Sequence, residues 1–254
     1  MILHRYTAES FLEAARHAAP GTWSHAWCGG LGRPATLERA TYGDDANVPQ
    51  ARALLERVQG AVETPRTTWR RDVAGAYPVV AEYLQGLPDC MRARRRSLDL
   101  SNPIAVYASI MAPAIEDADN MMRRGIAILA LALKLQAQRP IDLYAVCPWV
   151  ATTLVIRIPT RPLSIAHAAF ALSHPAYFRR LAHEVLYATG DQDTSINNDS
   201  YVPKILGMKP TDIYIGTGMS TLDWSGTRAN YLDMQADPIA WINAQLKRIA
   251  GGGR

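Results

Sequence analysis

Lysine and cysteine are scarce in this chain, and each shortage narrows what the protein can be. The 254 residues include 27 basic ones, of which only four are lysine and the rest arginine. The three cysteines, Cys28, Cys90 and Cys147, are far apart in the sequence. They form neither a CxxC metal motif nor the closely spaced framework of a disulfide-rich protein. We therefore expect a reducing, cytosolic setting.

Long apolar runs are also missing. The most apolar stretch, residues 126–135, is too short to span a bilayer, and the first residues, MILHRYTAESF, are too polar for a signal peptide. The sequence therefore predicts no membrane partner. A hydrophobic fraction of 48% still provides for one sizeable core and argues against a disordered chain.

Motifs for cofactors are absent where they would be expected. The predicted strand 104–109 leads into Ile110 and Met111, whereas a dinucleotide fold needs GxGxxG there so that the backbone can approach a pyrophosphate. The short run 216–218 (GTG) lacks the third glycine and is interpreted as a turn. No Walker motif occurs. We predict a protein without a cofactor.

Candidate metal ligands have simpler interpretations. Glu116, Asp117 and Asp119 cluster at the start of a predicted helix, where acids cap free N–H groups and complement the helix dipole. The segment beginning at His183 resembles HExxH, but Tyr187 stands where the second zinc ligand would be. The sequence predicts no metal site and no enzymatic activity.

Strand and helix patterns predict an α/β protein. We expect strands at 104–109, 141–146, 152–158 and 212–216, and helices at 8–18, 47–60, 116–136, 164–172, 175–187 and 237–249. A buried strand, a long helix and a second strand indicate a parallel crossover unit. The expected architecture is a three-layer Rossmann-like core over residues 101–254. Residues 1–100 are expected to form an α+β extension with a basic arm packed on that core, and residues 21–43 to be loops and short strands.

Arginine is unevenly distributed along the chain. Residues 66–96 contain seven arginines and three acids, and their net charge of +4 equals that of the whole chain. Arginine binds phosphate bidentately and stacks on flat rings, so this segment suits nucleic acid. Two alternatives remain open: codon bias in a GC-rich genome, and an ordinary solvated face. We interpret Arg123 and Arg124 as structural, paired with the acids at 116–119, and Gly125 as a site of close packing against the sheet.

Arginines interleaved with aromatic residues define the predicted nucleic-acid site. A positive track would hold phosphates, and aromatic rings would stack bases. The predicted residues are Trp69, Arg70, Arg71, Tyr77, Tyr83, Arg92, Arg94, Arg95, Arg96, Arg179 and Arg180.

Three segments carry a resemblance to a family of uncharacterised phage and prophage proteins. They are AYPVVAEYLQGLPDCM (76–91), MMRRGIAILALALKLQ (121–136) and LSIAHAAFALSHPAYFRRLAHE (163–184), and the likeness covers roughly residues 65–190. The core of that family resembles a von Willebrand A-type module without its metal site. Metal binding there would need Asp-x-Ser-x-Ser, from which residues 107–111 depart completely.

In size and basicity the chain also resembles the single-stranded-DNA-binding RNA polymerase cofactors of N4-like phages. This resemblance implies a protein that acts in the cytoplasm of the infected bacterial host, and we expect a homo-oligomer because several subunits would lengthen the binding track. It would bind unpaired promoter DNA and recruit a phage RNA polymerase in transcription regulation. The alternative is a metal-free A-type protein–protein interaction module without nucleic-acid binding. Base preference, DNA against RNA, subunit number and the order of loop 190–200 stay open.

Overall fold

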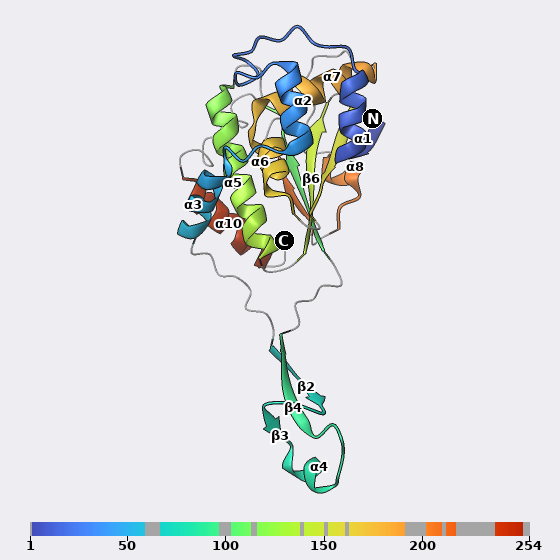
Figure 1. Ribbon diagram of the computed structural model, residues 1–254, viewed down its shortest axis with the longest axis vertical. Coiled ribbons are helices and arrows are strands. Elements are labelled where there is room, and N and C mark those ends of the chain that lie inside the picture. The colour runs from blue at the N-terminus through green and yellow to red at the C-terminus, as the bar shows by residue number, and fades with distance from the viewer. Residues whose placement is uncertain are drawn as a thin grey trace.

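The computed structural model describes residues 2–58, 67–96, 103–112, 116–137, 140–149, 152–160, 163–190, 202–209, 212–216 and 237–250. The predicted loop 190–200 therefore lies outside the described residues, apart from Gly190. Figure 1 shows two parts, a body of helices around a sheet and a small arm set apart from it. The α/β class expected from the sequence is confirmed.

A five-stranded mixed sheet forms the centre of the body, in the order β1-β7-β6-β5-β8. Neighbouring strands are parallel except for the antiparallel pair β6–β7. The strands are β1 (Ile2–Thr7), β7 (Thr152–Ile158), β6 (Ile141–Pro148), β5 (Ile104–Ser109) and β8 (Ile213–Ile215). The four strands expected from the sequence are therefore present, with small changes at their ends.

Strand β1 changes the expected domain boundary. It pairs in parallel with β7, from Ile2 opposite Thr152 to Thr7 opposite Arg157. The first residues therefore belong to the central sheet and not to a separate extension. Sequence reasoning missed this strand because its pattern is polar, with His4 and Arg5 in the middle.

The crossover unit is present as predicted. Helix α5 (Ala118–Gln136) joins β5 to β6, and buried apolar residues such as Ile128 and Leu131 cover the sheet from it. Asp117 is the N-cap, and its carboxylate accepts a hydrogen bond from the Asp119 backbone N–H at 2.6 Å. The acids at this helix start thus cap it, as expected.

Arg124 and Gly125 of α5 make contacts that differ from those expected. Arg124 is 4% exposed and donates to the carbonyls of Ser109 (2.6 Å) and Gly216 (3.3 Å), which confirms a structural role, with backbone carbonyls as acceptors in place of the expected acids at 116–119. Gly125 packs against a helix and not against the sheet. A Cβ there would lie 2.1 Å from the Ser173 Cα atom and 2.2 Å from the Leu172 carbonyl oxygen.

Helices cover one face of the sheet with a single large core, to which Val106, Leu143 and Ile156 contribute from the strands. These helices are α1 (Ala8–His17), α2 (Arg33–Tyr42), α3 (Val48–Arg57), α5, α6 (Ile165–Ser173), α7 (His183–Ala188) and α10 (Pro238–Ala250). Residues 21–32 form loops and turns, as predicted for 21–43, but helix α2 follows where further loops and short strands were expected. On the other face, α8 (Val202–Leu206) packs against Tyr107 and Val146.

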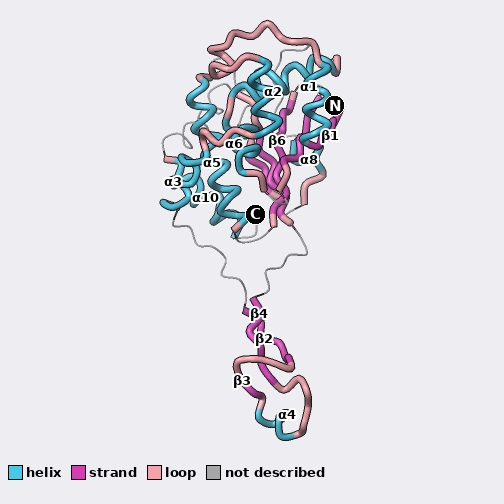
Figure 2. Tube along the Cα trace, viewed as in Figure 1, coloured by secondary structure: helices cyan, strands magenta, loops and turns pink. Residues whose placement is uncertain are grey.

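The arm, residues 67–96, is a three-stranded antiparallel sheet in the order β2-β4-β3 (Figure 2). Its elements are β2 (Thr67–Asp72), β3 (Tyr77–Pro78), the short helix α4 (Val80–Leu84) and β4 (Met91–Arg96). The arm was expected to pack on the core, but Figure 1 shows it apart from the body.

We expect Gly125→Ala to destabilise the body by about 1–3 kcal/mol, because the added methyl would overlap the backbone of α6. Helix propensity alone predicts the opposite sign, a gain of about 1 kcal/mol. Urea unfolding of the full chain measures the change. Ala53→Gly, at an exposed position of α3, is the control for propensity and should cost about 1 kcal/mol. An unchanged or higher stability of Gly125→Ala would contradict this packing.

Candidate nucleic-acid interface

The register of the arm decides which of the predicted residues can act together. Residues that lie directly opposite each other in an antiparallel pair share one face of the sheet. Trp69 lies opposite Arg94, Arg71 opposite Arg92, and Tyr77 opposite Arg92 from the other side. Since faces alternate along a strand, position 96 belongs to the same set. We call this set the basic face: Trp69, Arg71, Tyr77, Arg92, Arg94 and Arg96.

Two predicted arginines fall on the other side of the sheet. Arg70 lies opposite Ala93, and Arg95 opposite Thr68. Both positions alternate with those of the basic face, so the register does not bring them to Trp69 and Tyr77. Tyr83 is outside the sheet altogether, on α4, where it is 65% exposed. The sequence analysis grouped all of these residues because it did not identify the strand at 91–96 or its pairing with the strands on either side.

Gly75 makes the third strand possible. A Cβ at this position would lie 2.5 Å from the Arg92 carbonyl oxygen, so only glycine fits where the chain turns back onto β4. The same carbonyl accepts a hydrogen bond from the Ala76 backbone N–H at 2.9 Å, and the Val79 N–H donates to the Cys90 carbonyl at 2.7 Å. This turn places Tyr77 next to Arg92. Sequence reasoning had not singled out Gly75.

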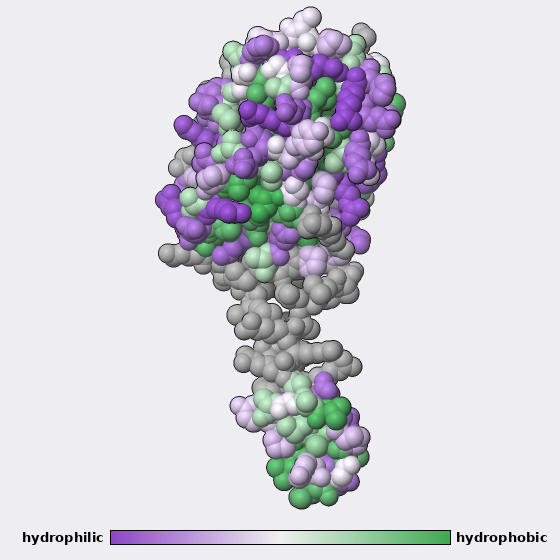
Figure 3. Space-filling model, in the orientation of Figure 1, coloured by the Kyte–Doolittle hydropathy of each residue, from purple (hydrophilic) through white to green (hydrophobic). Residues whose placement is uncertain are grey.

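The described side chains of the basic face are accessible. Tyr77 is 62% exposed, and Arg92 is exposed as well. Arg71 is exposed but forms an ion pair with Glu82 of α4, which ties the helix to the sheet. In the space-filling view, apolar residues gather at the free end of the arm (Figure 3). The arm thus carries an arginine-rich sheet and an apolar end.

Arg179 and Arg180 are wrongly placed in the predicted interface. They are 1% and 4% exposed and belong to a π-helical turn, η1 (Tyr177–Ala182), between α6 and α7. Arg179 donates to the Trp27 carbonyl at 2.9 Å. Its guanidinium carbon also lies over the Trp27 ring, 4.8 Å from the ring centroid. Arg180 donates to the Trp23 carbonyl at 3.3 Å. They hold the 21–30 loop on the body. In the sequence, the apolar residues on both sides of them were the sign that this segment is buried.

Aromatic rings enclose His183 directly after this turn. Its ring lies 5.2 Å from that of Trp23, 4.9 Å from Trp149 and 5.2 Å from Phe178. Burial, with a smaller effect of Arg179, lowers the pKa of His183 from 6.5 to about 4. A histidine so enclosed is neutral at physiological pH and packs as an aromatic residue.

Glu184, the next residue, also has a structural role. Its side chain is 1% exposed and forms an ion pair with Arg33 at 2.9 Å. It also accepts a hydrogen bond from the Gly21 N–H at 3.1 Å. The Arg33 guanidinium and the Gly21 N–H therefore satisfy the buried Glu184 carboxylate beneath the 21–30 loop. No group of three histidine, cysteine, aspartate or glutamate residues that could hold a metal occurs among the described residues.

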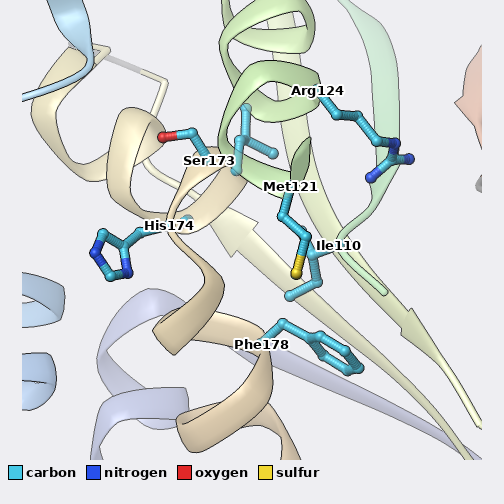
Figure 4. Close-up of a pocket in the computed structure, with 8 residues that line it drawn as sticks. Ile110, Met121, Arg124, Ser173, His174 and Phe178 are labelled. Atoms are coloured by element: carbon cyan, nitrogen blue, oxygen red, sulfur yellow. The ribbon is translucent and has the colours of Figure 1, made fainter. Parts of the chain in front are cut away.

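A small cavity at the carboxyl end of β5 offers little to a ligand (Figure 4). It is lined by Ile110, Met121, Phe178 and neighbouring residues. Figure 4 shows Met121, Ile110 and Phe178 converging, while the Arg124 and His174 side chains point away from them. Arg124 is bonded to strand carbonyls, and the His174 Nδ1 atom accepts from the Ala176 N–H at 3.1 Å. The polar groups are thus engaged in holding the body together.

Comparison with known proteins places most of the chain in one family. Residues 3–202 match the family described as Domain of unknown function (DUF7192). The chain belongs to this family. The match runs from β1 to the first residue of α8, so it includes the arm and most of the body but not β8 or α10. No curated protein and no solved structure matches the chain. Within the described residues, no helix is both long enough and apolar enough to cross a bilayer.

We expect the free energy of unfolding of this DUF7192 protein to fall as the pH decreases from 6.5 to 4. Burial lowers the pKa values of His174 and His183 to about 4, so in this window the unfolded chain binds protons that the folded protein does not. Each histidine would contribute on the order of 3 kcal/mol. Chemical unfolding across this pH range measures the loss.

His183→Phe should remove about half of that histidine-dependent loss, because an apolar ring suits the aromatic enclosure. Ala53→Gly, at an exposed position of α3, is the control, because it removes no titratable group and should keep the wild-type dependence on pH. A His183→Phe protein with the full wild-type loss of stability would show that His183 is already charged in the folded state.

Proposed function

We propose that this protein binds single-stranded nucleic acid on the basic face of its arm. The observation that carries the proposal is the register of β2, β3 and β4. It groups four arginines and two aromatic residues, far apart in sequence, on one side of a small sheet. Phosphates would be held by Arg92, Arg94 and Arg96, with Arg71 nearby. Bases would stack on Trp69 and Tyr77.

The spacing on this face favours an unpaired strand. Trp69 is on β2 and Tyr77 on β3, with the arginine positions of β4 between them. Adjacent strands are about 4.8 Å apart, which separates the two aromatic positions by roughly 10 Å across the sheet. A backbone lying along β4 would therefore have a ring on each side for its bases. Stacking on rings requires bases that are not paired.

The body is proposed as the scaffold that presents the arm. The order β7-β6-β5-β8 corresponds to the 3-2-1-4 part of a doubly wound sheet, although β7 is antiparallel. This order supports the finer prediction of a three-layer, Rossmann-like core of the A type. Arg124 occupies the carboxyl ends of β5 and β8, where such folds usually hold a ligand. A cofactor-free, non-enzymatic role follows from this proposal.

We further infer a role in transcription from the resemblance to the polymerase cofactors of N4-like phages. In that role a homo-oligomer would act in the cytoplasm of the infected host. It would bind unpaired promoter DNA through the arm and bring a phage RNA polymerase to it. A protein–protein interaction module without nucleic-acid binding is the second candidate, and the exposed apolar end of the arm favours it.

The test compares the two faces of the arm. We expect the triple change Arg92→Ala, Arg94→Ala and Arg96→Ala to weaken binding of a labelled single-stranded oligonucleotide at least about 10-fold at low salt. It should also flatten the salt dependence, by roughly 0.7 in log–log slope for each phosphate that the variant no longer neutralises. Fluorescence anisotropy at several salt concentrations measures both quantities.

The matched control is Arg70→Ala with Arg95→Ala, which removes positive charge from the opposite face. It should keep most of the affinity and change the slope less. Tyr77→Ala should weaken single-strand binding about 10-fold and duplex binding little. Equal losses from both faces would indicate a general charge effect. Absence of single-strand binding by the wild type at low salt would refute the function.

A further inference from the structure

The free end of the arm, residues 73–90, is apolar and uncovered. We call it the arm tip. Among its described side chains only Cys90 is buried. Besides Tyr77, which belongs to the basic face, it contains five of the eight large apolar residues that are exposed in the described part of the chain: Val73 (72%), Val80 (64%), Tyr83 (65%), Leu84 (78%) and Leu87 (44%).

Such a segment gains little by folding alone. Ordering each residue costs about 1–2 kcal/mol of backbone entropy, and burial of apolar surface is the main term that offsets this cost. The backbone bonds of β3 and α4 and the Arg71–Glu82 ion pair hold the tip in shape. An exposed ion pair contributes at most about 1 kcal/mol. The tip therefore leaves apolar surface that a partner would cover, and exposed apolar side chains gathered at one end of a domain are typical of an interaction surface.

Charge selects the partner. The tip lacks arginine and lysine, and its only charged residues are Glu82 and Asp89. Glu82 is already paired with Arg71. Aliphatic side chains offer nothing to phosphates, and the two acids disfavour an anionic bilayer surface. A second copy of the tip meets neither obstacle, because two nearly neutral apolar patches can pair without like-charge repulsion.

We propose that two copies of this protein associate through their arm tips, with α4 and the Leu84 side chain at the centre of the contact. A two-fold arrangement pairs the same patch on both copies. Side by side, the exposed Asp89 of one copy has the exposed Arg92 of the other as its counter-charge. The strands that carry arginine stay at the margin, where their mutual repulsion is weakest. Both basic faces then belong to one particle.

Sedimentation velocity of the full-length protein without nucleic acid tests this contact over a range of concentrations. The wild type is expected to form a dimer that dissociates on dilution. Val80→Glu with Leu84→Glu should raise the dissociation constant on the order of 10-fold or more, because two charges enter a desolvated apolar contact. The matched control is Tyr42→Glu, which changes a residue that is 77% exposed on α2 and should leave the dimer intact.

Each other outcome overturns the proposal. A wild type that stays monomeric at the highest concentration has no self-contact at the tip. Dissociation of the Tyr42→Glu protein together with unchanged association of the tip variant would place the interface on the body. Flotation of a monomeric wild type with vesicles of neutral phosphatidylcholine would assign the tip to a bilayer. Circular dichroism of all variants checks that the body is folded.

Self-association does not depend on the proposed nucleic-acid binding, and a second measurement separates the two. The tip variant should still bind a short oligonucleotide that occupies one arm. The triple arginine variant of the basic face should lose that binding. It should still dimerise more strongly than the tip variant, since Arg92 is only a marginal contact. A wild type that dimerises but does not bind the oligonucleotide would refute the nucleic-acid function alone.

Discussion

The organisation of the body depends on the hydrogen bonds that the buried Arg124 guanidinium donates. From the first half of α5 it reaches the carboxyl ends of two strands, β5 through the Ser109 carbonyl and β8 through the Gly216 carbonyl. A buried cation needs such acceptors, because a charge without partners in the protein interior costs several kcal/mol. The next residue, Gly125, lets α5 approach the backbone of α6. Two consecutive residues therefore fix the sheet and the helical layer together.

This arrangement separates support from recognition. In an open α/β sheet the carboxyl ends of the strands normally form the ligand crevice, but here a side chain of the protein occupies it. The buried arginines of η1 act in a similar way, since they bind carbonyls of the 21–30 loop. In the body, buried arginine side chains thus hold neighbouring segments together through hydrogen bonds to their backbone carbonyls. In the arm, Arg92 and its neighbours in register are on a surface. These arginines of the body are therefore buried and hydrogen-bonded, whereas Arg71 and Arg92 of the arm are exposed.

The sequence predicted the elements of the body well and their assembly less well. Strand 104–109 and the helix that follows it were recognisable because their apolar runs are long. Strand β1 was not, since its exposed positions make it polar and its partner β7 is about 150 residues away. Composition marked the arm as arginine-rich and aromatic. It did not separate Arg94 from Arg95, because residues 91–96 were not recognised as a strand, along which neighbours face opposite sides. Arg179 and Arg180 were misplaced because charge alone does not report burial.

The pairing of β1 with β7 also has a consequence for synthesis. The chain leaves the ribosome from its N-terminus, and β1 has no partner in the sheet until Thr152–Ile158 has emerged. The arm needs only contacts between residues 67 and 96, so its strands can pair much earlier. Local pairing is fast and distant pairing is slow. A nascent chain would therefore carry the paired, arginine-rich strands of the arm while its body is still open.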